Sequence, residues 1–115
     1  MDAHDLIEIE ARLSATADEL IKRTSAVAMA RQIKEFASDQ RKNLLARYTA
    51  PMLKDNSATA AETCARSDPQ YQHELDELAD QYRQAEKHIA AWDALHCKLE
   101  ALRSALSFGK SQVQM

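Results

Sequence analysis

The chain has few residues that interrupt a helix, with one Gly and two Pro in 115 residues. Gly and Pro disfavour a helix interior more than any other residues. Ala, Leu, Glu, Gln, Lys and Arg, which lose little side-chain freedom in a helix, are abundant. No segment shows the alternating pattern of a β-strand. The sequence therefore predicts an all-α fold.

The sequence also lacks long apolar runs and clusters of cysteine. Without an apolar run of helix-spanning length we expect no membrane segment. The first ten residues, MDAHDLIEIE, are acidic where a signal peptide is basic. Cys64 and Cys97 lie far apart, so we expect free, packed side chains and no disulfide. These features predict a cytoplasmic protein without a membrane partner.

Helical periodicity is clearest in the second half of the chain. Apolar residues recur there at alternating spacings of four and three, the pattern of a coiled-coil seam. The seam comprises Tyr71, Leu75, Leu78, Tyr82, Ala85, Ile89 and Trp92. Ser67 or Asp68 can cap this helix, and Pro69 suits its first turn. Because Gly109 favours a helix end, we predict a helix over 69–108 and a loose tail over 110–115.

Beyond Trp92 the seam has two possible continuations. One runs through His96, Leu99, Arg103 and Leu106, and the other through Leu95, Leu99, Leu102 and Leu106. The second is preferred because it keeps charge out of the seam. A helix over 69–108 would be about 60 Å long, which exceeds the width of a compact domain of this size. We therefore expect self-association to cover the seam through Tyr71, Leu75, Leu78, Tyr82, Ile89, Trp92 and Leu99.

The first half of the chain predicts one or two helices between residues 3 and 50. The stretch 22–26, with its Thr and Ser, is the expected break if there are two, and Pro51 is expected to close the helix. A short connector helix is predicted over 57–66, where Thr59 and Glu62 have capping-box spacing. The predicted fold is a single domain, 1–115, of two long antiparallel helices with a short helical connector, coiled-coil-like and completed by oligomerisation.

Charge is sorted along the chain. Residues 1–21 carry one basic and six acidic side chains, and residues 22–54 carry eight basic and two acidic. Residues 55–115 carry six basic and ten acidic, so the whole chain is at net charge -3. A basic segment of this kind in an acidic chain points to an anionic partner.

On a helical wheel five of the eight cations of the basic segment fall within about 100° of one another if the helix is continuous. This basic stripe comprises Arg23, Arg31, Lys34, Arg41 and Lys42. Leu45 interrupts it. The apolar side chains expected to be buried lie on the adjacent face: Ala26, Met29, Ile33, Phe36, Leu44 and Tyr48.

A stripe of cations suits a polyanion, because each contact with a phosphate releases counterions. Tyr48 borders the stripe and could stack on an unpaired base. An alternative stays open, in which the stripe pairs with acidic faces of the same chain or of sister subunits.

Side chains that could carry catalysis or bind a metal are sparse. Asp93, His96, Cys97 and Glu100 lie within two helical turns, but a metal site in a helical bundle needs a second such set. The sequence has no Gly-rich phosphate loop and no nucleophile elbow. We therefore expect no catalytic residues, no metal, no cofactor and no enzymatic activity.

The segments LLARYTA, SATAAETCARSDPQYQHELDEL and YRQAEKHIAAWDALHCKLEALRSALSFGK resemble small helical proteins of phage recombination modules, including UvsY-type recombination mediators. The resemblance covers 41–110. It implies an oligomeric protein that binds single-stranded DNA and assists a recombinase or annealing protein. It also implies that Arg31, Lys34, Arg41, Lys42 and Arg47 contact the DNA backbone. The resemblance would lead us to expect a net basic chain, whereas this chain is net acidic.

Two functions are consistent with this scaffold. The first is a DNA recombination accessory protein that binds single-stranded DNA through Arg23, Arg31, Lys34, Arg41, Lys42 and Arg47. The second is a helical adaptor or inhibitor that acts on a host or phage protein without contact to nucleic acid.

Overall fold

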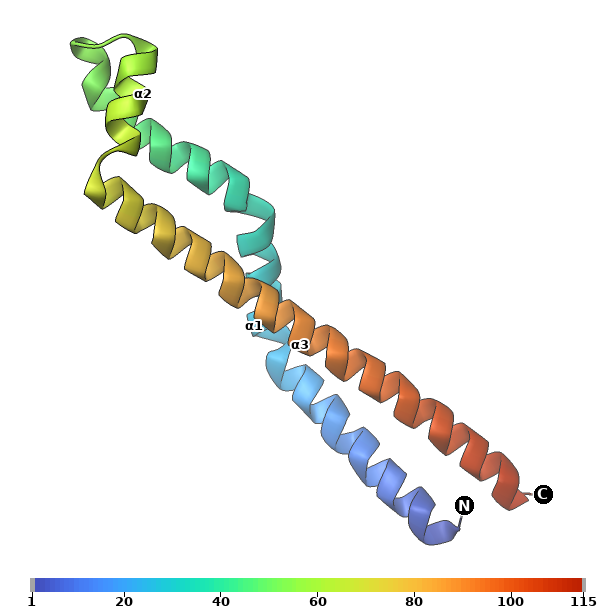
Figure 1. The fold of residues 1–115 in the computed structure, drawn as a ribbon. Coiled ribbons are helices and arrows are strands. Elements are labelled where there is room, and N and C mark those ends of the chain that lie inside the picture. The colour runs from blue at the N-terminus through green and yellow to red at the C-terminus, as the bar shows by residue number, and fades with distance from the viewer. Residues whose placement is uncertain (1, 115) are drawn as a thin grey trace. The chain divides into compact units, whose positions relative to one another are not determined.

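The computed structural model describes residues 2–114, and every regular element in this part of the chain is a helix. In chain order these are α1 (Ala3–Thr49), the 3₁₀ helix η1 (Ala50–Lys54), α2 (Ala58–Arg66) and α3 (Pro69–Gln114) (Figure 1). The prediction of an all-α fold with two long helices and a short connector helix is confirmed. No helix within these residues is long and apolar enough to cross a membrane.

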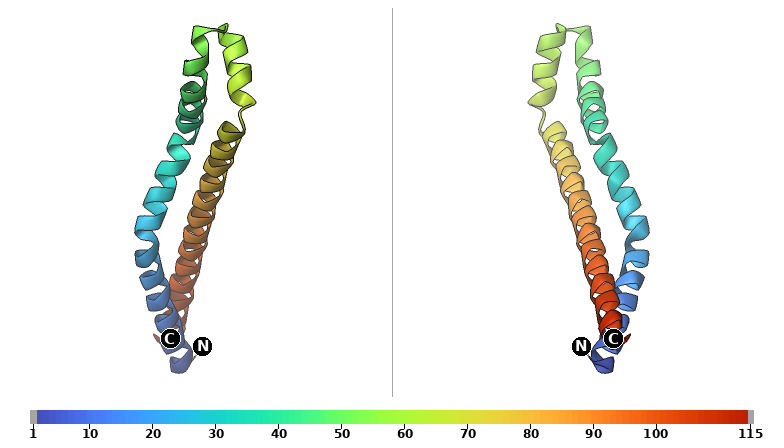
Figure 2. Two further views of the ribbon diagram at one scale, coloured as in Figure 1. Left: turned by 90° about the vertical axis from the view of Figure 1, so that its left-hand side faces the viewer. Right: turned by 90° about the vertical axis from the view of Figure 1, so that its right-hand side faces the viewer.

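The chain divides into two compact units. Unit 1 contains Met1–Ala28 and Lys87–Met115, and unit 2 contains Met29–Glu86. Each unit pairs part of α1 with part of α3, and the two helices run antiparallel within it (Figure 2). The single domain expected from the sequence stays a prediction.

Unit 1 packs the first part of α1 against the last part of α3. Thr16, Leu20 and Val27 are buried on α1. Lys110 Nζ lies 3.8 Å from Glu10 Oε1, which joins the start of α1 to the end of α3. Because this pair is exposed, the apolar contacts supply most of the stability of the unit.

In the same unit, burial on α3 follows the second continuation of the seam. Leu99 is buried and Leu102 is half-buried. Arg103 is exposed, and its Nη1 lies 2.9 Å from Glu100 Oε1 in the same helix. Burying Arg103 would require this charge to be desolvated, which explains why Leu102 takes the inward position.

The prediction that α3 ends at Gly109 is wrong. The helix continues to Gln114, so residues 110–114 form no loose tail. Gly109 is buried, and no residue that the structure describes has a positive φ. A glycine ends a helix by adopting the left-handed conformation, which Gly109 does not adopt. It lies instead on the inward face, where the missing side chain leaves room for close packing.

Helix α1 is continuous through 22–26, so the first half of the chain forms one helix rather than two. The hydroxyl of Thr24 donates a hydrogen bond to the Leu20 carbonyl oxygen, 3.1 Å away in the preceding turn. The polar group is therefore satisfied inside the helix and does not interrupt it. The helix ends at Thr49, as Pro51 predicted, and η1 follows with Pro51 in its first turn.

Unit 2 contains the rest of α1, η1, α2 and the start of α3. Its buried side chains are mostly small, which allows the helices to approach closely. They are Ala30, Leu44, Ala61, Ala65, Tyr71 and Ala85. Helix α2 packs on η1.

Polar caps fix the two ends of the connector. Ser57 Oγ accepts a hydrogen bond from the Ala60 N–H at 3.3 Å and caps α2. The capping box expected at Thr59 and Glu62 is therefore wrong. Glu62 instead forms an ion pair with Arg66 within α2 at 3.0 Å. Of the two cap candidates for α3, Asp68 serves, because its Oδ1 accepts from the Gln70 N–H at 2.8 Å.

The prediction of which face of α1 is buried is only partly correct in unit 2. Leu44 is buried there, and Ile33 and Tyr48 are half-buried. Met29 is 65% exposed and Phe36 49%. In unit 1, Ala26 is also exposed and Val27 is buried in its place. Ala30, in the same stretch of α1, is 2% exposed, so the smaller side chain takes the inward position.

Candidate nucleic-acid interface

The structure places most of the predicted DNA-binding cations on α1 of unit 2. Arg31, Lys34, Arg41, Lys42 and Arg47 are all exposed there. Arg23 lies in unit 1 and is half-buried. Its Nε forms an ion pair with Glu19 Oε1 at 2.8 Å, one turn earlier in α1. A phosphate would have to compete with this carboxylate, so Arg23 is the weakest of the predicted contacts.

Four of these cations form what we call the basic flank: Arg31, Lys34, Arg41 and Lys42. Lys34 and Arg41 are seven residues apart and so lie on the same side of α1, about 10 Å apart along its axis. Within the described part of the chain, Lys34, Arg41 and Lys42 make no ion pair. Their charges are therefore directed to solvent and open to an external anion.

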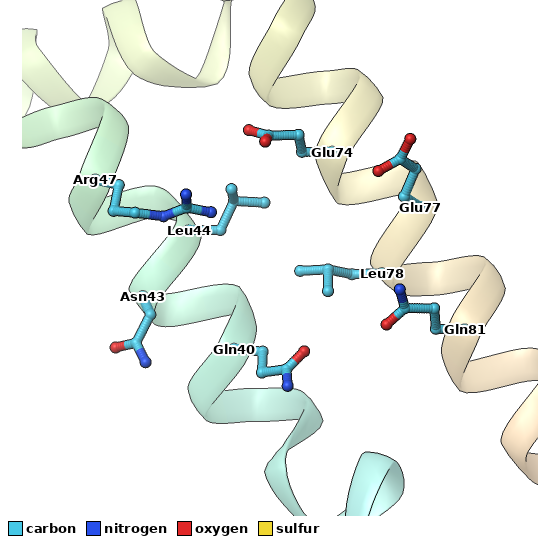
Figure 3. A pocket seen from close by; sticks show the side chains of 8 residues that line it. All are labelled: Gln40, Asn43, Leu44, Arg47, Glu74, Glu77, Leu78 and Gln81. Carbon is cyan, nitrogen blue, oxygen red and sulfur yellow. The ribbon is translucent and has the colours of Figure 1, made fainter. Parts of the chain in front are cut away.

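Arg47 lies in a different setting, a groove between α1 and α3 of unit 2 (Figure 3). This mixed-charge groove has a volume of about 260 Å³. It is lined by Gln40, Asn43, Leu44, Arg47, Glu74, Glu77, Leu78 and Gln81. The guanidinium of Arg47 and the carboxylate of Glu74 point toward each other across it. An anion entering the groove would meet two carboxylates as well as the cation, so Arg47 differs from the basic flank.

Tyr48 is held by α3 rather than presented to a ligand. Its hydroxyl donates a hydrogen bond to Glu74 Oε2, and its ring meets that of Tyr71 edge-on with centroids 5.6 Å apart. The hydrogen bond to Glu74, with burial and the negative charge of that carboxylate, raises the pKa of Tyr48 to about 12. Both ends of the side chain are engaged, so the base-stacking role expected for Tyr48 does not fit the structure.

Tyr82 is the aromatic side chain beside the basic flank. It lines a narrow hollow between α1 and α3 of unit 2 together with Arg41 and Ala37. Sequence reasoning assigned Tyr82 to the oligomer seam only. The contact of Tyr48 with Tyr71 sets an antiparallel register, and from that register Tyr82 follows as the neighbour of Ala37 and Arg41.

The residues of the predicted oligomer seam lie largely at the contact between α1 and α3 of one chain. Tyr71 and Leu99 are buried, and Leu75, Leu78, Tyr82, Ile89 and Trp92 are half-buried. Their role in an oligomer stays a prediction. Several large apolar side chains are exposed on other faces and favour self-association. They are Ile7, Ile21, Met29, Phe36, Met52, Leu53, Phe108 and Val113.

The His, Cys, Asp and Glu side chains of residues 2–114 do not come together in a metal site. In residues 2–114 no group of three or more His, Cys, Asp or Glu could hold a metal ion. His96 packs against the ring of Trp92, with centroids 4.2 Å apart. Cys64 and Cys97 are free, as expected, but both are exposed, so the expectation of packed cysteines is wrong. Each lies on an outward face of its helix.

Comparisons with protein-family models, with curated proteins and with solved structures find no match for this chain. The resemblance to UvsY-type mediators stays a prediction from the sequence segments quoted above.

Proposed function

We propose that this chain is a non-enzymatic accessory protein that binds single-stranded DNA through the basic flank of α1. The observation that carries the proposal is the exposure of Lys34, Arg41 and Lys42 on one side of a continuous helix, with no ion pair to any residue of 2–114. A rigid helix holds these charges at fixed spacing, which suits a phosphate backbone. The proposed role is binding.

The expected binding is electrostatic and tolerant of sequence. Each cation placed near a phosphate of a single strand adds about -0.7 to the slope of log affinity against log salt. The acidic side chains of the chain do not oppose this if they face away from the strand, and they would orient the protein on it.

Assistance to a recombinase or annealing protein is the second part of the proposal. It rests on the resemblance of 41–110 to phage recombination mediators. In such a role the protein would hold the strand while a recombinase or annealing protein acts on it.

The test is charge reversal in the flank, Arg41→Glu with Lys42→Glu, followed by titration of an unstructured oligonucleotide at several salt concentrations. Loss of two phosphate contacts should make the salt slope shallower by about 1.4 and weaken binding at every salt concentration. The matched control is Lys87→Glu with Lys98→Glu, two exposed lysines of α3 in unit 1, which changes net charge equally. Unchanged affinity in the flank variant, or equal loss in both, rejects the proposal.

A helical adaptor or inhibitor is the second candidate function. It is favoured by an apolar hollow in unit 2, formed by side chains of α1, η1 and α2 that include Leu45, Ala46, Leu53 and Ala58. Apolar hollows of this kind accept side chains of a protein partner. Lys42 also lines this hollow, so the discriminating variant is the single reversal Arg41→Glu. Capture of a partner that survives nuclease, high salt and Arg41→Glu would favour this function over DNA binding.

A further inference from the structure

The chain has three tyrosines, all in unit 2, and they are used in different ways. Tyr71 is 3% exposed and packs against Tyr48. Tyr48 donates its hydroxyl proton to Glu74. Tyr82 is half-buried, and within the described residues its hydroxyl makes no hydrogen bond and its ring makes no aromatic contact. Tyr82 is therefore the one tyrosine with neither a hydrogen bond from its hydroxyl nor an aromatic contact within residues 2–114.

The surroundings of Tyr82 combine three kinds of group around one hollow. Arg41 of the basic flank lines it, and Gln40 and Gln81 contribute side-chain amides from α1 and α3. Ile33, Ala37 and Leu78 complete the lining. A cation, an aromatic ring and amides that can reach base edges are the groups that recognise an unpaired nucleotide.

We propose that Tyr82 stacks on an unpaired base of a strand whose phosphates contact Arg41 and Lys34. This inference rests on the proposed DNA binding and names the residue that makes it selective for single strands. Every base has a π-face, so stacking on Tyr82 adds affinity without sequence preference. In a duplex the base faces are covered by neighbouring pairs, so Tyr82 gains nothing from double-stranded DNA.

The size of the hollow decides how a base would lie. Its volume is about 10 Å³, far too small for a nucleobase to enter. The base therefore lies across the exposed part of the Tyr82 ring at the rim. Arg41, on the facing helix, stays free to contact the adjoining phosphate.

The experiment compares a thymidine oligonucleotide with an abasic oligonucleotide of the same length. Both carry the same phosphates, so the basic flank binds both, and only stacking separates them. The wild-type chain should bind the thymidine strand about ten-fold more tightly. Tyr82→Leu should remove most of this preference without changing the affinity for the abasic strand. Tyr82→Phe, which keeps the ring, should retain the preference.

The outcomes separate this inference from the function on which it rests. If the wild-type chain binds both strands equally, the stacking role is wrong and no variant is needed to show it. If Arg41→Glu with Lys42→Glu weakens binding but Tyr82→Leu leaves the preference intact, DNA binding stands and Tyr82 is not the stacking residue. If neither strand binds, both proposals fail.

A structural role for Tyr82 gives a different result. If Tyr82→Leu weakens binding to both strands equally and also changes the molecular mass in solution, Tyr82 belongs to a subunit contact and the stacking proposal is overturned. Circular dichroism of each variant checks that the helices are retained.

Discussion

Two regions of α1 in unit 2 carry similar cations in opposite settings. On the basic flank, Lys34, Arg41 and Lys42 face solvent, and none of them pairs with a carboxylate in residues 2–114. In the mixed-charge groove, less than two turns beyond Arg41, Arg47 faces Glu74. Arg47 is also exposed and makes no ion pair in residues 2–114, so the two settings differ in the carboxylates nearby, and the side of the helix decides which neighbours a cation has. Counting basic residues along the sequence does not reveal it.

The charges of the two helices in unit 2 explain how both settings arise. Residues 29–49 carry five basic and two acidic side chains, and residues 69–86 carry five acidic and one basic. Ion pairs in the second segment run along α3 itself, between His73 and Glu77 at 2.9 Å and between Arg83 and Asp80 at 3.5 Å. Within residues 2–114 these acidic side chains make no ion pair with Lys34, Arg41 or Lys42.

The largest effect is expected from a change that breaks the scaffold under both regions. Leu44 is 2% exposed and lies on α1 between Arg41 and Arg47. Leu44→Ala should lower the free energy of unfolding by about 2–5 kcal/mol, through lost burial and the cavity it leaves. Chemical denaturation followed by circular dichroism measures this.

The matched control for Leu44→Ala is Leu53→Ala, which removes the same atoms from a side chain that is 50% exposed. It should cost less than about 1 kcal/mol. If both variants lower the free energy of unfolding equally, Leu44 is not the buried centre of unit 2. The basic flank and the mixed-charge groove would then not depend on the same buried side chain.

The second prediction concerns the hydrogen bond at the edge of the mixed-charge groove. The pKa of Tyr48 is raised from 10.0 to about 12, first by the hydrogen bond to Glu74. Because the folded state favours the protonated phenol, its stabilising contribution is fully present below pH 10 and is lost as the pH rises through about 12. A pH titration of tyrosinate absorbance should show a transition near pH 12 that belongs to Tyr48.

Two variants assign that late ionisation. Tyr48→Phe should remove it, and Glu74→Gln should move it back toward 10.0 because the accepting carboxylate is gone. If no tyrosinate transition occurs near pH 12 in the wild-type chain, Glu74 does not hold Tyr48 and the groove is more open than the structure indicates.

The sequence was sufficient for the elements of the fold but not for the faces of α1. The scarcity of Gly and Pro and the seam on α3 predicted the helices. Pro51 predicted the end of α1. Gly109 misled because its identity indicates a helix end, while its burial on the inward face is a property of the packed pair. Met29 and Phe36 were expected to be buried because they are apolar, yet the buried side chain of this stretch of α1 is the smaller Ala30.

The candidate site was predictable only in part for a related reason. The wheel positions of Lys34, Arg41 and Lys42 relative to one another follow from a helix after residue 26, and only the position of Arg23 depended on continuity at Thr24 and Ser25. The setting of Arg47 and the engagement of Tyr48 depend on which residues of α3 lie opposite. That register depends on how the two helices pack, so it cannot be predicted from the sequence of either helix alone.

The smallest expected effect is also the most direct test of the comparison. Glu77 lines the mixed-charge groove, and Glu77→Gln removes one of the two carboxylates near Arg47. If those carboxylates keep Arg47 from binding an anion, the variant should bind an unstructured oligonucleotide up to about three-fold more tightly, with a salt slope steeper by up to about 0.7. The control is Asp76→Asn, an exposed position on α3 outside the groove, which changes net charge equally. If only Glu77→Gln raises the affinity, the carboxylates of the groove keep Arg47 from binding the strand. If both variants raise the affinity equally, only the net charge of the chain matters, and Arg47 does not differ from the basic flank.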